Sequence, residues 1–401
     1  MRASDRRRAG REPDELYYIS TSKSMGKREL LLIVAFAVMG IIVYQVTAPA
    51  PPAGSRSVTV GGLLEKMRRA ARGNRSSAEI TSTQNHRIET AVTDLRLRLR
   101  GATIRVEGEE RPDVAVELRA WSNGYDDAEA QSLAKQTVLK LDPAGGVLIA
   151  TIQYPDPGQQ RATVTLKVPA RLRVRVDESG PATISGVAAL ELGAVRGETS
   201  ISRVAGAVSG THRFGELTLS QVGTVKMTTQ ASEAKIEGVR DVAITARGGE
   251  IRVTGATGAI EIDSNQTDVT LEKIETVTTP LRINANGGTV RVNGLRTEAR
   301  IDGRNTDIEI VMDKAVPLAV YNEGDQDIEL TPPPGGYRLD ALVRDGRLTP
   351  PDLLTALGLS PVTSEDGNEV RATGAIAGGG PTITLRATRG DIVLRPRSTE
   401  K

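Results

Sequence analysis

Acidic side chains recur at a fixed place in the repeating middle of the sequence, and they are the residues best suited to chemistry. Each stands three residues before an apolar position of the repeat. We refer to them as the acidic column: Glu198, Glu216, Glu233, Glu250, Asp268, Asp307 and Asp327. Thr289 interrupts the series, and Asp391 repeats it near the C-terminus. If these positions fall in register on neighbouring strands, their side chains stack about 4.8 Å apart along one edge of a sheet.

Three interpretations of the acidic column stay open, because stacked like charges cost up to about 1 kcal/mol each unless something offsets them. The carboxylates can accept backbone N–H groups at strand corners and face water, with Lys235, Arg252 and Arg291 nearby. They can bind Ca²⁺ between strands, or they can line a groove that cleaves polysaccharide. The sequence favours the first interpretation. It lacks the GGxGxD phrase of calcium-binding repeats, and glycosidases need two carboxylates in unlike environments.

The other searches for reactive groups are negative. The chain has no cysteine, and its two histidines, His86 and His212, do not have the spacing of metal ligands. Four corner strings (263–268, 284–289, 302–307 and 322–327) are rich in Asn, Asp and Gly, which favours turns over a ligand site. We therefore predict no catalytic, cofactor-binding or dedicated metal-binding residue and no cofactor. Ca²⁺ at the acidic column is kept as the alternative.

The elements that would position these residues repeat every 17–21 residues between Ala182 and Leu330. One apolar anchor marks each cycle: Ile184, Ile201, Leu219, Ile236, Val253, Leu271, Val292, Ile310 and Leu330. So short a period, with apolar residues at every second position, is typical of β-solenoid coils that bury their apolar face on the next coil. We predict an all-β fold with a parallel β-solenoid, right-handed because parallel crossovers prefer that hand.

The N-terminal region predicts a membrane anchor. Leu30–Val46 is an uncharged apolar run of 17 residues, close to the length of a spanning helix, and we place the helix at 30–48. Eight Lys or Arg residues precede it, so the N-terminus is expected in the cytoplasm. The predicted location is the bacterial inner membrane, single-pass, with the rest of the chain in the periplasm. A cleaved signal peptide is the alternative.

The pattern divides the chain into seven parts. They are a cytoplasmic tail (1–29), the anchor (30–48), a linker with a short helix (49–79), a β-rich entry module (80–180), the β-solenoid (181–330), an irregular insertion with a short helix (331–374) and a C-terminal coil or cap (375–401). Within the entry module and at its end, LRLRLR (95–100) and RLRVRV (171–176) alternate strictly. This alternation indicates half-buried strands whose outer face is a row of solvated arginines, not a nucleic-acid site.

A family resemblance accompanies this pattern. VTLKVPARLRVRV (164–176), the coils of the form G-[ED]-x-x-[IVL]-x-G-[VAL] and GGGPTITLRATRGDIVL (378–394) resemble the bacterial "putative-adhesin" family of unassigned function. The chain is also similar to the related auto-transporter adhesin head domains. The resemblance covers roughly residues 95–396. It implies a β-solenoid, usually envelope-associated, and supplies no established catalytic residues to carry over.

Together these features predict a membrane-anchored, non-enzymatic envelope protein whose solenoid surface serves adhesion, scaffolding or partner binding. The expected partners are the membrane, through 30–48, and an envelope protein or polysaccharide. The net charge of +2 gives no reason to expect nucleic acid. One alternative is a polysaccharide lyase or hydrolase built on a β-helix. Another is an envelope signalling protein that reports through its short tail, where PDELYY (13–18) is the most binding-like segment.

Overall fold

The computed structural model describes residues 76–155, 158, 160–274 and 279–397, together with Phe36, Met39 and Gly40. The chain divides into two compact units, Met1–Gly73 and Asn74–Lys401. The fold below is that of the second unit.

The predicted membrane anchor is not supported. Within the described ranges, no helix reaches the length and apolar character that crossing a bilayer requires. Apart from Phe36, Met39 and Gly40, the segment 30–48 lies outside the described residues, as do the predicted tail at 1–29 and residues 49–75 of the predicted linker. The prediction of a single-pass inner-membrane protein with a periplasmic bulk is withdrawn with the anchor.

Strands make up most of the second unit, and the described residues form one 26-stranded sheet. The first group of elements is β1 (Ser76–Arg87), β2 (Asp94–Arg98), β3 (Thr103–Glu109), β4 (Asp113–Gly124), α3 (Asp127–Lys135), β5 (Val138–Ala144), β6 (Val147–Gln153) and β7 (Gln160–Pro169). The Asp126 side chain caps α3 by accepting a hydrogen bond from the Glu129 backbone N–H at 2.8 Å.

The middle group contains the repeats. Its strands are β8 (Arg173–Ser179), β9 (Ala182–Ser185), β10 (Ala189–Arg196), β11 (Thr199–Glu237), β12 (Asp241–Thr254), β13 (Ile260–Asn265), β14 (Asp268–Glu272), β15 (Leu281–Asn286), β16 (Thr289–Leu295), β17 (Ala299–Arg304), β18 (Asp307–Met312), β19 (Leu318–Gly324) and β20 (Ile328–Thr331). The last group is β21 (Tyr337–Arg344), β22 (Leu348–Thr349), α4 (Pro351–Ala356), β23 (Val362–Thr363), β24 (Glu369–Ile376), β25 (Thr382–Arg389) and β26 (Ile392–Leu394).

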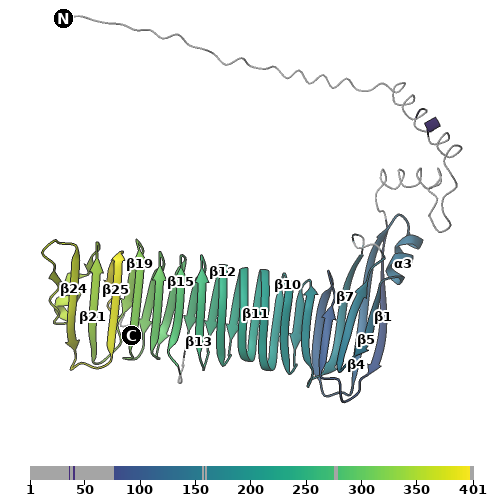
Figure 1. The fold of residues 1–401 in the computed structure, drawn as a ribbon, viewed down its shortest axis with the longest axis horizontal. Helices are drawn as coiled ribbons and strands as arrows, with labels where there is room; N and C mark the ends of the chain where they lie inside the picture. Colours follow the sequence, from purple (N-terminus) through teal and green to yellow (C-terminus); the bar gives the residue numbers. More distant parts are fainter. Residues whose placement is uncertain are drawn as a thin grey trace, which may run out of the picture. The chain divides into compact units, whose positions relative to one another are not determined.

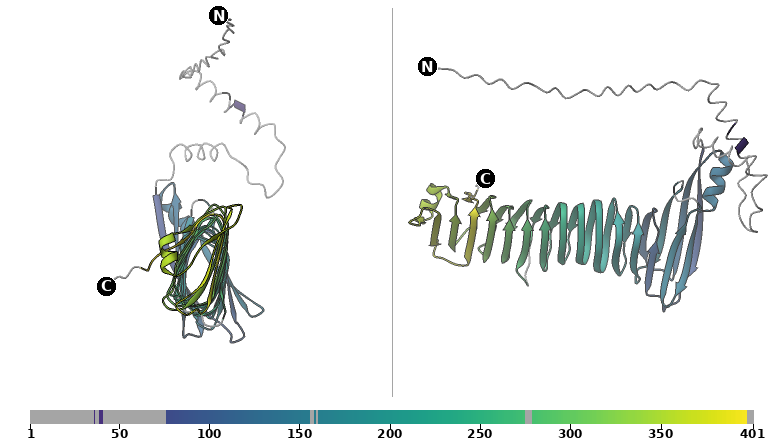
Figure 2. Two further views of the ribbon diagram at one scale, coloured as in Figure 1. Left: turned by 90° about the vertical axis from the view of Figure 1, so that its left-hand side faces the viewer. Right: turned by 45° about the horizontal axis from the view of Figure 1, so that its top comes forward.

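Two parallel ladders run through the middle group (Figure 1). The first ladder joins β8, β10, β11, β12, β13, β15, β17 and β19. The second joins β9, β11, β12, β14, β16, β18 and β20. The long strands β11 and β12 belong to both. Seen end-on, the two ladders face each other across a narrow interior (Figure 2, left).

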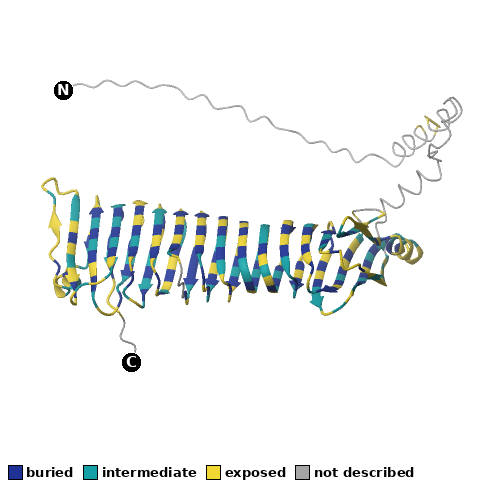
Figure 3. Cartoon of the chain, turned by 60° about the horizontal axis from the view of Figure 1, so that its bottom comes forward, coloured by how far each residue is buried: buried dark blue, intermediate teal, exposed yellow. Residues whose placement is uncertain are grey.

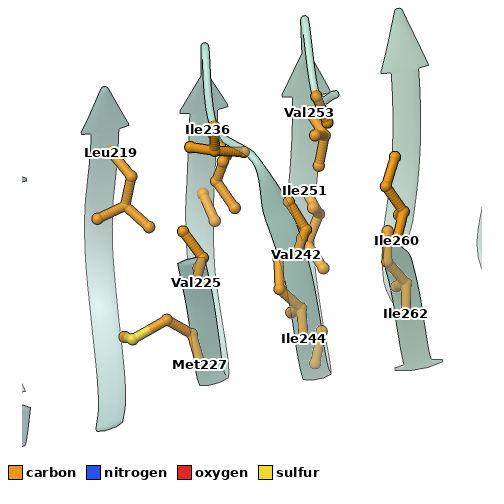
Figure 4. Packing of buried hydrophobic residues seen from close by; sticks show 14 of the residues in the cluster. Leu219, Val225, Met227, Ile236, Val242, Ile244, Ile251, Val253, Ile260 and Ile262 are labelled. Carbon is orange, nitrogen blue, oxygen red and sulfur yellow. The ribbon is translucent and has the colours of Figure 1, made fainter. Parts of the chain in front are cut away.

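The core lies between the ladders. Inward and outward residues alternate along each strand, which produces the bands of buried and exposed residues in Figure 3. All nine anchors of the sequence repeat are at most 1% exposed. In Figure 4, Leu219, Ile236 and Val253 of the second ladder lie near Val225 and Val242 of the first. The aliphatic side chains fill an interior that has little room for rings, in line with an aromatic content of 2%.

The all-β class is confirmed, but the predicted right-handed parallel β-solenoid is wrong, because the sheet is mixed. At one end β4 pairs antiparallel with β1 and β7, and β5 pairs antiparallel with β6. At the other end β24 pairs antiparallel with β21 and β23. The physical reason is seen at β5 and β6: the two residues between Ala144 and Val147 are enough to join antiparallel strands, whereas parallel strands need a long crossover.

The last two strands of the chain, β25 and β26, do not lie at the end of the stack. β25 pairs in parallel with both β19 and β21, and β26 pairs with both β20 and β22 (Figure 1). The chain therefore continues past the position of β25 to form β21–β24 at the end of the stack. It then returns, and β25 fills the place between β19 and β21. Asp391 N–H donates to Asp327 Oδ1 at 2.8 Å across this junction, although the two residues are 64 apart in sequence.

Candidate functional site

The acidic column is aligned in the second ladder. Glu233 pairs in register with Glu250, and Glu250 pairs with Asp268. Thr289, the exception in the series, pairs with Asp307. Glu198 and Asp327 directly precede β11 and β20, and Glu216 lies within β11. The predicted stacking is therefore present from Glu233 through Glu250 to Asp268.

Cations offset the charge of part of the acidic column. Lys235 Nζ lies 3.1 Å from Glu216 and 2.9 Å from Glu233, and Arg252 lies 3.0 Å from Glu250. The hydrogen bond from Lys235 holds the pKa of Glu216 below its usual value. Arg291 contacts Glu309 at 3.2 Å instead of the column. These contacts support the first of the three interpretations, since the carboxylates face water beside basic side chains.

Other carboxylates of the acidic column accept hydrogen bonds from backbone N–H groups at the corners between strands. Asp268 Oδ1 accepts from Thr289 N–H at 2.9 Å, and Asp391 Oδ1 accepts from Arg347 N–H at 2.8 Å. The column is thus spread along an edge and is not gathered at one point. Among the residues that the structure describes, no group of three or more His, Cys, Asp or Glu side chains is placed to hold a metal ion.

The corner strings have a second role that sequence reasoning missed. Gln266, Gly287 and Asn305 adopt left-handed conformations, as expected of turns. The first half of each string, however, is strand, and its outward residues line a hollow of 510 Å³ over the first ladder. Its lining includes Thr245, Arg247, Asp263, Asn265, Asn284, Asn286, Asp302, Arg304, Tyr321 and Glu323. The sequence did contain a signal for these strands, because polar residues recur at every second position within the strings.

Contacts between strands and within one strand order the polar groups of this hollow. Asn284 Nδ2 donates to Asp263 Oδ1 at 2.7 Å on the neighbouring strand. Arg300 holds Asp302 through two hydrogen bonds of 2.7 and 2.9 Å, and its guanidinium lies 4.9 Å from the centre of the Tyr321 ring. Paired side chains of this kind have fewer accessible rotamers, which lowers the entropy cost of binding a ligand.

The hollow continues along the first ladder. A second hollow of 420 Å³ shares Thr245 and Asp263 with it, and a third of 390 Å³ shares Ser209 with the second. We call the three together the long groove, which extends from β8 to β19. Small outward residues such as Ala207 and Ala243 form part of its floor. The neighbouring side chains are longer, and the groove lies between them.

Basic and acidic groups alternate at the β8 end of the long groove. Asp177 accepts from Arg96 at 2.6 Å, from Arg98 at 3.1 Å and from Arg175 at 2.9 Å. Leu95, Leu97, Leu99, Leu172, Val174 and Val176, which separate the arginines in sequence, are buried. The predicted half-buried strands with an outer arginine row are therefore confirmed, and three of the arginines share the Asp177 carboxylate.

No family model and no curated protein matches the sequence. Among solved structures, a "putative cell adhesion protein" from Clostridium sporogenes ATCC 15579 is 8% identical, with a TM-score of 0.19 and coverage of 79% of this chain and 100% of that chain. A "putative adhesin" from Bacteroides fragilis NCTC 9343 is 9% identical, with a TM-score of 0.21 and coverage of 79% and 97%. Both carry adhesin names, but at these values neither assigns a function, and the relation to auto-transporter head domains is not confirmed.

Proposed function

We propose that this protein is a non-enzymatic, adhesin-like binding protein whose long groove holds an extended, uncharged polysaccharide. The observation that supports this proposal is the continuity of the three hollows, which share lining residues from β8 to β19. Parallel strands lie about 4.8 Å apart, so the groove presents similar polar groups at regular intervals. A linear polymer can contact several of these intervals at once.

The chemistry of the lining favours hydroxyl-rich ligands. Carboxylate, amide, hydroxyl and guanidinium groups alternate along it, as in Asp263, Asn284 and Arg304. These groups accept and donate hydrogen bonds in the pattern that sugar hydroxyls require. Around the first hollow, the positive charges of Arg247 and Arg304 stand against several carboxylates, so the groove has no excess of positive charge to attract a polyanion.

The same lining argues against hydrolysis. Asp263 and Asp302 lie on β13 and β17, on either side of Asn284. A general acid must retain its proton near neutral pH, which usually requires an apolar environment. Asp302 is instead paired with Arg300, and Asp263 is exposed and accepts from Asn284. The groove therefore fits binding better than cleavage.

Size-exclusion chromatography tests this proposal. The full-length chain is incubated with neutral and acidic polysaccharides, with Ca²⁺ or with chelator, and both polymer length and co-migration are followed. Intact neutral polymers that co-migrate with the protein are expected. Shortened polymers would replace the proposal with the lyase or hydrolase alternative. Absence of co-migration with every neutral polymer would overturn it.

Two variants localise the binding. Asn284→Ala and Tyr321→Ala each remove one contact from the long groove, and each is expected to weaken binding about fivefold, the value of one hydrogen bond. Asn293→Ala is the matched control, because it removes an exposed amide from β16 in the second ladder. Equal losses in all three variants would place the binding elsewhere.

A further inference from the structure

A further hollow of the described surface lies outside the long groove. It measures 720 Å³ and opens on the outer side of β1, β4, β7, β3 and β9. Its lining combines an aromatic ring, three arginines and a group of threonines: Glu79, Thr103, Arg105, Arg119, Trp121, Arg161, Thr163, Thr165 and Thr183, with Gly101, Ile104 and Ala162. Thr183 is the one lining residue from the sequence repeat, and no member of the acidic column lines the hollow.

Trp121 is the only tryptophan of the chain, and it is half-buried on the outer side of β4. The antiparallel pairing of β4 with β7 sets it opposite Arg161, and pairing with β1 sets it opposite Glu79. The Arg161 guanidinium lies 5.6 Å from the ring centre, within the range of a cation–π contact. The ring is thus held in place beside a fixed positive charge.

The lining carries three arginines and one carboxylate, Glu79, so the hollow has an excess of positive charge. Arg105 and Arg161 form no ion pair with any carboxylate in the part of the chain that the structure describes. Arg119 is neutralised by Glu117 at 2.6 Å. Two guanidinium groups therefore face the hollow with their charge available, and each can hold a carboxylate or sulfate through paired N–H donors.

Threonines occupy the strand positions beside Arg105 and Arg119. Arg105 pairs in register with Thr165 on one side and with Thr183 on the other. Thr163 lies between Arg119 and Thr103 in the same way. Each hydroxyl can donate one hydrogen bond and accept up to two, so the floor of the hollow suits a ligand with many hydroxyl groups.

We propose that this hollow is a binding site for an acidic saccharide, a sugar unit that bears a carboxylate or a sulfate. Arg105 and Arg161 hold the acidic group, the threonines bind ring hydroxyls, and the Trp121 ring packs on the apolar side of the sugar. A single-stranded nucleic acid is the less suitable ligand. Sites for it present several rings on which successive bases stack, and the lining here contains one.

The site does not depend on the proposed function of the long groove, since the two share no lining residue. The two also differ in charge. The long groove has balanced charges and suits a neutral polymer, whereas this hollow suits an anion. An experiment can therefore contradict the proposal for one site without affecting the proposal for the other.

The single tryptophan provides a direct test in the unmodified full-length chain. Its fluorescence is followed while oligogalacturonate, which is carboxylated, or sulfated dextran is added, with unsulfated dextran and oligothymidylate as comparisons. A saturable change is expected with at least one acidic saccharide and none with unsulfated dextran. Added salt should weaken it, because salt screens exposed charges. Co-migration in size-exclusion chromatography provides a second readout.

Charge-matched variants locate the site. Arg105→Gln and Arg161→Gln are each expected to weaken binding of the acidic saccharide about tenfold, the value of one charge-assisted hydrogen bond. Arg291→Gln on β16 removes the same charge from a distant exposed position and should leave binding unchanged. Asn284→Ala in the long groove should also leave it unchanged.

Four results would overturn the proposal. The first is the absence of both a fluorescence change and co-migration with either acidic saccharide. The second is an equal response to unsulfated dextran. The third is tighter binding of oligothymidylate, which would make the hollow a nucleic-acid site. The fourth is an equal loss of binding affinity in Arg291→Gln and Arg161→Gln, which would show that the net charge of the protein, and not this hollow, determines binding.

Discussion

The imidazole of His212 lies inside the fold, with its Nδ1 atom 2.9 Å from the hydroxyl oxygen of Ser232. Its other nitrogen, Nε2, lies 2.9 Å from the carbonyl oxygen of Gly197. A carbonyl oxygen can only accept, so in a neutral ring Nε2–H donates to Gly197 and Nδ1 accepts from the Ser232 hydroxyl. The one hydrogen of that hydroxyl is then not available to the carbonyl oxygen of Gln230, which lies 3.1 Å away. A residue that sequence inspection assigned no role therefore joins neighbouring segments inside the stack.

His212 should make stability depend on pH. Burial lowers its pKa from the ordinary value of 6.5, and the hydrogen bond to Gly197 offsets only part of that change. The unfolded chain therefore binds a proton more readily than the folded one. The contribution of the neutral ring is fully present above about pH 6.5 and is lost as pH falls toward the lower pKa of the folded state.

Denaturant midpoints of the wild type and of His212→Gln, measured on both sides of pH 6.5, test this expectation. The variant should be less stable at neutral pH because it loses a buried contact. Its stability should also fall less than that of the wild type as the solution is acidified. Identical pH dependences in the two proteins would contradict the prediction.

Phe214 is expected to lower stability. It has a φ of 58° and is 53% exposed. Equivalent corners in neighbouring strands carry Gly248, Gln266, Gly287 and Asn305, also with positive φ. A bulky side chain in this conformation costs roughly 1–2 kcal/mol, and half of the ring faces water.

Replacing Phe214 by Asn or by Gly should therefore raise the free energy of unfolding by about 0.5–1 kcal/mol, the relief of this backbone strain. Chemical denaturation measures the change. A loss of stability in both variants would show that packing of the ring outweighs the strain. Val362, which is exposed on β23 without positive φ, is the matched position where Val362→Asn should give no gain.

Asp177 should stabilise the end of the first ladder. Burial alone would raise its pKa, but Arg96, Arg175 and Arg98 more than offset this and lower it from 3.8. Its side chain is 19% exposed. Asp177→Asn leaves three guanidinium groups without their shared carboxylate, which should cost about 1–2 kcal/mol of unfolding free energy after allowance for solvent screening.

The sign of the acid dependence follows from the lowered pKa. The contribution of Asp177 is present above the unfolded value of 3.8 and is lost as pH falls through the folded value. The wild type should therefore lose more stability than Asp177→Asn in that acidic range. Asp142→Asn, at an exposed position of β5, is the control and should change stability by less than about 0.5 kcal/mol. A similar loss in both variants would contradict the role assigned to Asp177.

The sequence by itself determined which side chains face inward. Alternation of apolar and polar residues requires no knowledge of neighbouring strands, because successive residues of any strand point to opposite sides. The nine repeat anchors, Leu95 and Leu97 are accordingly buried. The acidic column was also readable, since equal spacing from an anchor gives equal register in a parallel pair.

Only the tertiary structure decided which strands are neighbours and in which direction they run. The alternation of β4 or β24 is the same in a parallel and in an antiparallel pair, so the closed ends and the mixed sheet were not predictable from it. The insertion of β25 between β19 and β21 depends on pairing across long stretches of chain. The hollow around Trp121 and Arg105 has the same origin: its residues come from five strands, and their proximity is set by packing and not by spacing along the sequence.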